Sequence, residues 1–233
     1  KCSLRSCGIE IRGRSSNLTL NYRTTEEIYN FAMRLQDHIR YKDMNDERME
    51  RDKAVCIFHG PVPEVREYSS LEEEIQAVVA DIRRLIQADV STQEICVMLR
   101  QNKMVQQVSE QMMREGIEIY RPGEKDDIRV KGVRMMTMHR GKGLEYTYVY
   151  LPCLCEGILP EHWKLKQAET EQQIQDIMES EANLLSVAIT RSRRQVWLSY
   201  HKAPSPLIER YLKRSGQNDW RQGMATRMKR RFL

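Results

Sequence analysis

The sequence predicts an α/β fold built around a largely parallel β-sheet. Strand-like apolar runs alternate with amphipathic helical segments along most of the 233 residues, and this alternation is typical of parallel sheets covered by helices. Ile95 to Leu99 is a continuous apolar run, as expected of a strand that is buried on both faces. The length allows one domain, or one domain with a small appendage, and a sizeable core.

The first helix is expected to begin at Thr24, because Thr24-Thr25-Glu26-Glu27 is typical of a capping box. Apolar residues then recur at helical spacing as far as Ile39. A strand is predicted at residues 54–58. Ser70 to Glu73 forms a second capping box, which begins a helix with a buried apolar face that extends to Ile86.

The remaining elements continue the alternation. Residues 102–115 predict a helix, and Gly116 is placed to end it in the left-handed conformation. Further strands are predicted at residues 117–120, 133–138, 146–151 and 196–200, and further helices in the stretch ending at Ile189 and at residues 205–213.

Composition limits the class of protein. Hydrophobic residues at 40% and charged residues at 30% describe an ordinary globular chain rather than a disordered one. No apolar run approaches the roughly 18 residues of a membrane span, and no signal-peptide pattern opens the sequence. We therefore expect a cytoplasmic protein that does not contact a membrane.

The cysteines indicate reduced thiols rather than a metal site. Cys56 and Cys96 lie in apolar strand-like runs, where a thiol behaves as a small hydrophobe. Cys153 and Cys155 are separated by one residue instead of the two to four of zinc knuckles, and only His162 is near them in the sequence. No metal ligand is therefore predicted.

The net charge of +5 is concentrated at the end of the chain. Residues 214–233 are expected to form a basic C-terminal tail. Its positive residues from 221 onward are Arg221, Arg227, Lys229, Arg230 and Arg231. Such a tail can follow phosphates through counterion release, but a solvated terminus explains it equally well.

Three short motifs carry most of the functional information. Residues 139–145, His-Arg-Gly-Lys-Gly-Leu-Glu, stand between two strand-like runs; residues 187–191 are Val-Ala-Ile-Thr-Arg, and residues 21–23 are Asn-Tyr-Arg. In this order they resemble the last three motifs of UvrD/Rep-like superfamily 1 DNA helicases. The resemblance implies a RecA-like three-layer α/β domain at residues 18–213, preceded at residues 1–17 by a remnant of another domain.

A phosphate-binding loop is absent from the sequence. Gly141-Lys142-Gly143 lacks the spacing of Gly-x-x-x-x-Gly-Lys-Ser/Thr and has no hydroxyl residue after its lysine. The chain therefore resembles the C-terminal half of an ATP-dependent DNA helicase or translocase. ATP with Mg²⁺ would be bound mainly by an N-terminal RecA-like domain of the same polypeptide, and this chain alone is predicted to be inactive.

The family usually carries a large helical accessory subdomain between two of the predicted strands. Here only residues 121–132 lie in that gap, with Pro122-Gly123 as a turn followed by a charged loop. The chain therefore resembles the compact branch of the family. The helix start at residues 204–207, Pro-Ser-Pro-Leu, is similar to that of the same branch.

The resemblance assigns five residues to the nucleotide. Arg191 and Arg23 would be arginine fingers, because a planar guanidinium can neutralise the charge that develops during phosphoryl transfer. Tyr22 would stack on adenine, Glu145 would contact the ribose hydroxyls, and Gly143 would let the backbone approach closely. The alternatives are that Arg191 is part of a solvated basic run, that Tyr22 is a packed aromatic at a strand end and that Arg23 is a capping side chain.

The resemblance also assigns four residues to single-stranded DNA. Arg100 and Asn102 directly follow the buried strand, where open α/β sheets place ligand sites. They match a pair that holds the strand's phosphate backbone, and His139 and Lys142 match positions that also contact the strand. Asn102 could instead cap a helix, and His139 could be structural.

A different class of function stays open. The family usually has acidic and arginine residues, and then a tyrosine, ahead of its last motif; this chain has Ala182, Asn183 and Ser186 there. These differences are compatible with a DNA-binding or interdomain docking module of a degenerate helicase without motor activity.

Overall fold

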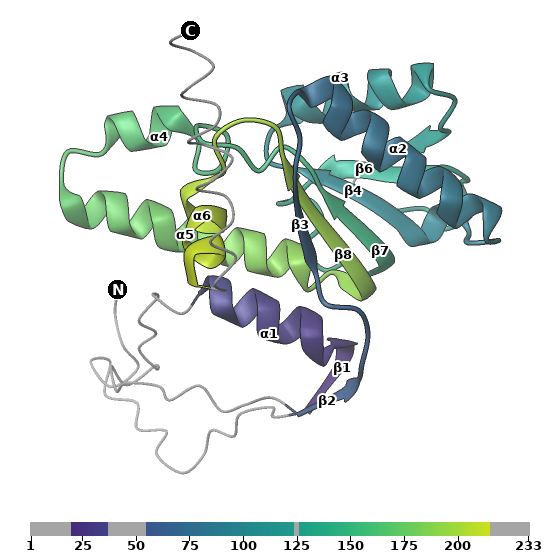
Figure 1. The fold of residues 1–233 in the computed structure, drawn as a ribbon, viewed down its shortest axis with the longest axis horizontal. Coiled ribbons are helices and arrows are strands. Elements are labelled where there is room, and N and C mark those ends of the chain that lie inside the picture. Colours follow the sequence, from purple (N-terminus) through teal and green to yellow (C-terminus); the bar gives the residue numbers. More distant parts are fainter. Residues whose placement is uncertain (1–19, 37–54, 124–125, 215–233) are drawn as a thin grey trace, which may run out of the picture.

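A six-stranded parallel sheet forms the centre of the molecule. The computed structural model describes residues 20–36, 55–123 and 126–214. Within these ranges, helices cover both faces of the sheet, and a separate two-stranded parallel sheet lies near the start of the chain (Figure 1). The predicted α/β fold with a parallel sheet is therefore confirmed. The expected remnant at residues 1–17 and the tail beyond Arg214 lie outside the described residues.

The elements follow the predicted alternation along the chain. The strands are β1 (Leu20–Thr25), β2 (Val55–Phe58), β3 (Glu64–Glu67), β4 (Ile95–Leu99), β5 (Ile119–Tyr120), β6 (Val133–Thr137), β7 (Tyr146–Leu151) and β8 (Ser192–Tyr200). The helices are α1 (Glu26–Leu35), α2 (Leu71–Gln87), the short 3-10 helix η2 (Thr92–Glu94), α3 (Asn102–Arg114), α4 (His162–Gln167), α5 (Glu171–Ile189) and α6 (Pro206–Arg214).

The strand order places β4 and β7 in the middle of the sheet. The six strands run in the order β3-β8-β7-β4-β6-β5, and every neighbouring pair is parallel. All five residues of β4 are fully buried, as the apolar run predicts. Because the strands are parallel, the residues that precede them share one edge of the sheet and the residues that follow them share the other.

Two cores lie on opposite faces of the sheet. Cys96 and Met98 of β4 point to the face that is covered by α1, α5 and α6. Ile95, Val97 and Leu99 point to the other face, which is covered by α2 and α3. This alternation is the two-residue period of a strand, and it gives the three layers that were expected.

Two helix starts differ in detail from the predicted capping boxes. Thr25, not Thr24, caps α1, because its Oγ1 accepts the Ile28 N–H at 3.3 Å. The Thr24 hydroxyl donates instead to the Ser192 carbonyl at 2.7 Å, a tertiary contact that fixes α1 beside β8. Ser70 caps α2 as predicted, but the Glu73 carboxylate accepts from the backbone and hydroxyl of Ser69 rather than from Ser70.

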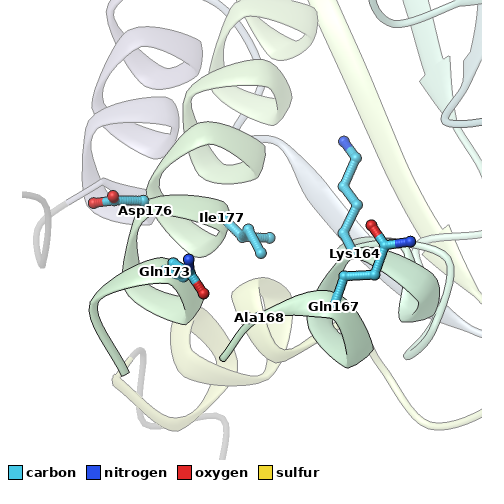
Figure 2. Close-up of a pocket in the computed structure, with 6 residues that line it drawn as sticks. All are labelled: Lys164, Gln167, Ala168, Gln173, Asp176 and Ile177. Atoms are coloured by element: carbon cyan, nitrogen blue, oxygen red, sulfur yellow. The ribbon is translucent and has the colours of Figure 1, made fainter. Parts of the chain in front are cut away.

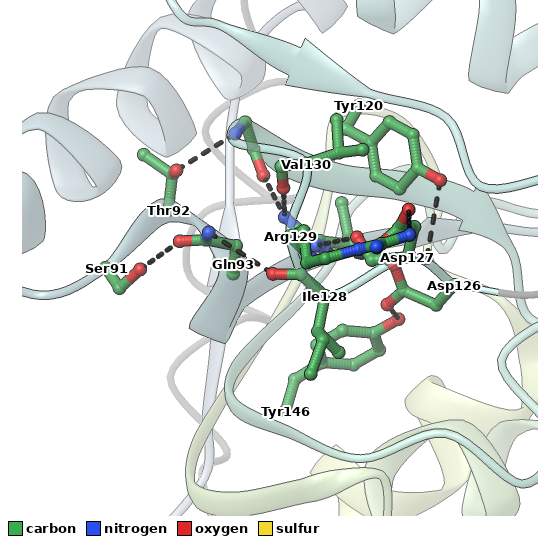
Figure 3. Close-up of polar contacts among 12 residues, drawn as sticks. Ser91, Thr92, Gln93, Tyr120, Asp126, Asp127, Ile128, Arg129, Val130 and Tyr146 are labelled. Carbon is green, nitrogen blue, oxygen red and sulfur yellow. Dashed lines mark hydrogen bonds and ion pairs between the residues drawn. The ribbon is translucent and has the colours of Figure 1, made fainter.

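The short connection from β5 to β6 is held by a buried arginine. Arg134 of β6 donates from Nη1 to the carbonyls of Val130 and Gly132, each at 2.8 Å, and from Nη2 to that of Asp127 at 3.0 Å. Figure 3 shows this region, with the Tyr146 hydroxyl donating to Asp126 at 2.7 Å. The described part of the predicted charged loop, residues 126–132, is thus held against the sheet, and β5 pairs directly with β6.

Candidate functional site

Three residues from distant parts of the chain meet at the amino end of the sheet. Glu145 directly precedes β7 and Arg191 directly precedes β8, and the Tyr146 N–H donates to the Arg191 carbonyl at 2.9 Å. Arg23 of β1 forms a hydrogen-bonded ion pair through Nε with Glu145 Oε1. The three motifs that were singled out in the sequence therefore converge, and we call these three residues the amino-end cluster.

Arg191 in this cluster is held by backbone carbonyls. Its Nε donates to the Val187 carbonyl at 3.0 Å, and its Nη1 lies 3.5 Å from the Leu144 carbonyl. It forms no ion pair with any residue that the structure describes. Burial lowers the pKa of Arg191, and the neighbouring positive charge of Arg23 lowers it further against the opposing effect of Glu145. Two cations against one anion make this cluster attractive to an external anion.

The two other residues predicted to contact the nucleotide lie within two residues of cluster members in the sequence. Tyr22 stands beside Arg23 on β1 with 63% of its surface exposed, so its ring is available for contact rather than packed. Gly143 has φ +89, a conformation that favours glycine, and a Cβ at this position would meet nothing within 4 Å. The backbone in front of Glu145 is therefore open to a close approach.

At the opposite edge, Arg100 follows β4 and is buried in an ion-pair network. Its Nε and Nη2 donate to the two carboxylate oxygens of Glu181, each at 2.7 Å, and Nη2 also lies 2.8 Å from Glu161 Oε2. Lys164 donates to Glu181 Oε1 at 2.9 Å. We call Arg100, Glu161, Lys164 and Glu181 the carboxyl-end network. Two cations meet two anions in it, so its charge is balanced.

Glu181 is the most buried anion of this network. Burial alone would raise its pKa, but hydrogen bonds from Arg100 and Lys164, with their positive charges, outweigh burial and leave the pKa below its ordinary value. The bidentate contact with Arg100 is the geometry in which a guanidinium binds a carboxylate most strongly. Glu181, Glu161 and Lys164 were not predicted as site residues. The signal that could have found Glu181 is a charged residue on the otherwise buried face of α5.

The other residues predicted to contact DNA lie at the start of α3 and in the segment that connects β6 to β7. Asn102 is exposed and is the first residue of α3, whereas Gln101 occupies the N-cap position, so the capping alternative is wrong. His139 is exposed at the end of β6. Burial lowers the pKa of His139, and the positive charges of Arg100 and Lys164 lower it further. The negative charges of Glu181 and Glu161 oppose this effect without cancelling it. Lys142 is exposed three residues later. Their contacts with DNA stay a prediction, as does that of Arg100.

A pocket opens beside the carboxyl-end network. It has a volume of about 330 Å³ and lies between α4 and α5 (Figure 2). Its lining residues are Lys164, Gln167, Ala168, Gln173, Asp176 and Ile177. Only Lys164 belongs to the network, and none of the residues predicted from the sequence lines the pocket.

The fold and the two clusters define a parallel α/β domain that gathers charged residues at both ends of its sheet. The family model described as the UvrD-like helicase C-terminal domain matches residues 16–126 and 121–203. The chain belongs to this family. The two matched segments overlap at residues 121–126, which lie within the short connection, residues 121–132, where the family's accessory subdomain was expected to be missing.

Curated relatives show which proteins contain similar segments. An ATP-dependent DNA helicase Rep of Buchnera aphidicola is 37% identical over 68 residues, which are 29% of this chain and 9% of that protein. The ATP-dependent DNA helicase srs2 of Schizosaccharomyces pombe is 37% identical over 71 residues, 30% of this chain and 7% of that protein. These matches thus span less than a tenth of the length of either relative.

A solved structure supports the fold. The C-terminal domain of a possible DNA helicase from Lactobacillus superimposes with a TM-score of 0.55 at 15% identity, covering 82% of this chain and 93% of that one. At this level of identity the likeness concerns the fold alone. Among the described residues, no helix combines the length and apolar character needed to cross a membrane.

Proposed function

We propose that this chain is the C-terminal half of an ATP-dependent DNA helicase or translocase. The observation that carries the proposal is the amino-end cluster, in which Arg23, Glu145 and Arg191 meet although they come from three separate motifs. Arg191 keeps its guanidinium free of carboxylate partners among the described residues, as a group that receives a phosphate should. ATP with Mg²⁺ would be held mainly by an N-terminal RecA-like domain of the same polypeptide.

In this proposal the amino-end cluster acts on the terminal phosphate. Negative charge on the phosphoryl oxygens must be stabilised during transfer, and fixed guanidinium groups do this without reorganising at the moment of reaction. Arg191 is fixed by two backbone carbonyls and Arg23 by Glu145. Tyr22 offers an exposed ring to the base, and Glu145 offers a carboxylate to the ribose hydroxyls.

The opposite edge would meet single-stranded DNA. Asn102, His139 and Lys142 are exposed and can reach a phosphate backbone, whereas Arg100 has its donors on Glu181 and Glu161. Glu161 is the more exposed of these two carboxylates. A phosphate could therefore take the place of Glu161 at Arg100 Nη2 while Glu181 stays bound.

The alternative is a docking module of a degenerate helicase, which rests on Ala182, Asn183 and Ser186. Ala182 is fully buried, and Ser186 Oγ donates to the Ala32 carbonyl of α1 at 3.1 Å. Gln36 donates to Asn183 Oδ1 at 3.0 Å. These side chains pack α5 against the α1 segment, so they account for the unusual residues without loss of the amino-end cluster. The motor interpretation is therefore the better supported of the two.

The experiment is an arginine substitution in the full-length polypeptide. Arg191→Ala should reduce DNA-stimulated ATP turnover by roughly 10³-fold or more, as is general for arginine fingers. DNA binding without nucleotide should be retained, and Arg191→Lys should recover little, because an ammonium lacks the planar fork. The matched control is Arg193→Ala, since Arg193 is exposed and its guanidinium donates to the Thr147 hydroxyl at 3.3 Å. Equal losses at the two positions would contradict the proposal.

A second measurement tests the division of labour between the two halves. This chain alone should show no ATP turnover above background, with or without DNA, since it contains no phosphate-binding loop. Turnover by the purified chain that disappears in Arg191→Ala would contradict the half-motor assignment. Turnover by the full-length polypeptide would rule out the degenerate module.

A further inference from the structure

A third cluster, made of residues that belong to neither cluster described above, lies at the carboxyl ends of β7 and β8. Glu74 of α2, Cys153 after β7 and His201 after β8 each offer one donor atom, and these atoms lie within 4.8 Å of one another. All three residues are buried. Cys155 adds a second sulfur, which lies 3.6 Å from His201 Nδ1.

Glu74 is held firmly at the centre of this cluster. Its Oε1 accepts the Cys153 N–H at 2.8 Å and the Ser199 hydroxyl at 2.5 Å. Its Oε2 lies 2.5 Å from His201 Nδ1, within hydrogen-bond distance. Buried charges in proteins are commonly paired or bound to a metal ion, and this carboxyl group lies where a metal ion could be bound together with the His201 imidazole.

The backbone at Cys153 provides an independent observation. Cys153 has φ +63, in the left-handed region that favours glycine and costs another residue on the order of 1 kcal/mol. Backbone strain of this kind persists where the side chain is needed, and here it places a sulfur beside Glu74 and His201.

We propose that Glu74, Cys153 and His201 bind a structural Zn²⁺ ion, with Cys155 as the fourth ligand. Two sulfurs, an imidazole and a carboxylate form a donor set that suits zinc, and four protein ligands with no open position characterise a structural site. On binding, the two thiols and the Glu74–His201 pair release their protons to solvent. At zinc bond lengths, the separation of Glu74 Oε2 and His201 Nδ1 would open to about 3.3 Å.

The sequence pattern argued against zinc because only His162 was near Cys153 and Cys155. His162 is exposed and belongs to α4, so it takes no part in the cluster. The fold supplies His201 and Glu74 from other elements instead. The ion would join α2 to the ends of β7 and β8, a stabilising function that is independent of any motor activity.

The test measures metal in the full-length polypeptide, expressed with zinc in the medium and purified without a metal-binding tag. Elemental analysis should find about one zinc ion per chain attributable to this site. Cys153→Ser and His201→Gln should each lose that ion. The matched control is Cys96→Ser, because Cys96 is equally buried but lies in β4 outside the cluster. It should retain the ion.

A second measurement uses the wild-type protein, so that the proposal can be tested even if the variants fail to fold. Metal-free wild-type protein should bind added Co²⁺ with the visible absorption of cobalt–thiolate bonds, and added Zn²⁺ should raise its thermal unfolding temperature. Zinc-free wild-type protein whose unfolding temperature does not respond to Zn²⁺ would show that the cluster is only a Glu–His ion pair. Zinc that is retained in both Cys153→Ser and His201→Gln would place the ion elsewhere. Either result would overturn the proposal.

Discussion

At the amino ends of β7 and β8, Arg23 pairs with the partly exposed carboxylate of Glu145, and Arg191 donates only to backbone carbonyls among the described residues. At the carboxyl end of β4, by contrast, Arg100 is enclosed by Glu181 and Glu161. The first arrangement leaves positive charge unbalanced, although Arg191 is as buried as Arg100 and only Arg23 is largely open to solvent. The second arrangement balances the charge. An arginine at the end of a parallel strand can therefore serve either an external anion or the domain itself, and its partners decide which.

The largest expected effect tests whether the carboxyl-end network is structural. Glu181→Ala removes the bidentate partner of a buried arginine, and loss of one partner of a buried pair typically costs about 3–5 kcal/mol. Urea unfolding of this chain should show a decrease of that size in the free energy of unfolding.

The matched variant at the other end is Glu145→Ala. Its pair with Arg23 is largely exposed, so the free energy of unfolding should change by no more than about 1 kcal/mol. In the full-length polypeptide this variant should instead weaken nucleotide binding. Equal destabilisation by the two substitutions would remove the difference between the two ends.

The second prediction concerns acid. The folded-state pKa of Glu181 is lowered, so its contribution to stability is complete above its unfolded pKa of about 4.3 and is lost as the pH falls through the folded value. The stability advantage of the wild type over Glu181→Gln should thus be constant from pH 7 to about pH 5 and shrink below about pH 4.3. Urea unfolding at a series of pH values measures it. An advantage that grows on acidification would contradict the assignment.

The third prediction asks whether Arg100 can reach DNA when Glu161 is neutralised. Glu161→Gln should raise the affinity for single-stranded DNA, because Arg100 can then contact one additional phosphate. One such contact steepens the dependence of log affinity on log salt concentration by about 0.7. Arg100→Ala should weaken binding and reduce the slope by the same amount, provided that circular dichroism shows a folded protein. Unchanged slopes in both variants would confine Arg100 to a structural role.

The smallest expected effect belongs to His139. Burial and the charges of Arg100 and Lys164 lower its pKa below 6.5, so it is neutral at neutral pH. If it contacts the strand, affinity for single-stranded DNA should rise as the pH falls below about 6.5, because protonation adds a cation beside the phosphates. His139→Gln should remove this increase and leave the affinity at pH 8 nearly unchanged. Fluorescence anisotropy across pH 5.5–8 at fixed salt measures both.

The sequence predicted those elements whose pattern is local. The apolar run of β4 and the helix that ends before Gly116 are found as predicted, with φ +78 at the glycine. By contrast, β3 was missed because Glu-Val-Arg-Glu has no apolar alternation, and it becomes a strand only by pairing with β8. The strand predicted at residues 196–200 begins earlier, at Ser192.

The residues of the candidate sites also fall into two groups, those that the sequence could identify and those that depend on tertiary packing. Motif order identified Arg23, Glu145 and Arg191, and the parallel sheet explains why residues before β7 and β8 are neighbours. No spacing could identify Glu181 as the partner of Arg100, because that contact depends on how α5 packs across the edge of the sheet. The same holds for Glu74 and His201, which are separated by most of the domain.

The segment between β6 and β7 has a mechanical consequence. Because the strands are parallel, residues 138–145 must cross from the carboxyl edge to the amino edge, roughly 20 Å of sheet, with at most about 32 Å of backbone. Turns at Thr137 consume part of that length, and Gly141 is pressed against the sheet, where a Cβ would lie 2.7 Å from Met98 Sδ. The segment from His139 to Glu145 is therefore nearly taut. We expect a displacement of His139 at the carboxyl edge of the sheet to be transmitted to Glu145 at the amino edge.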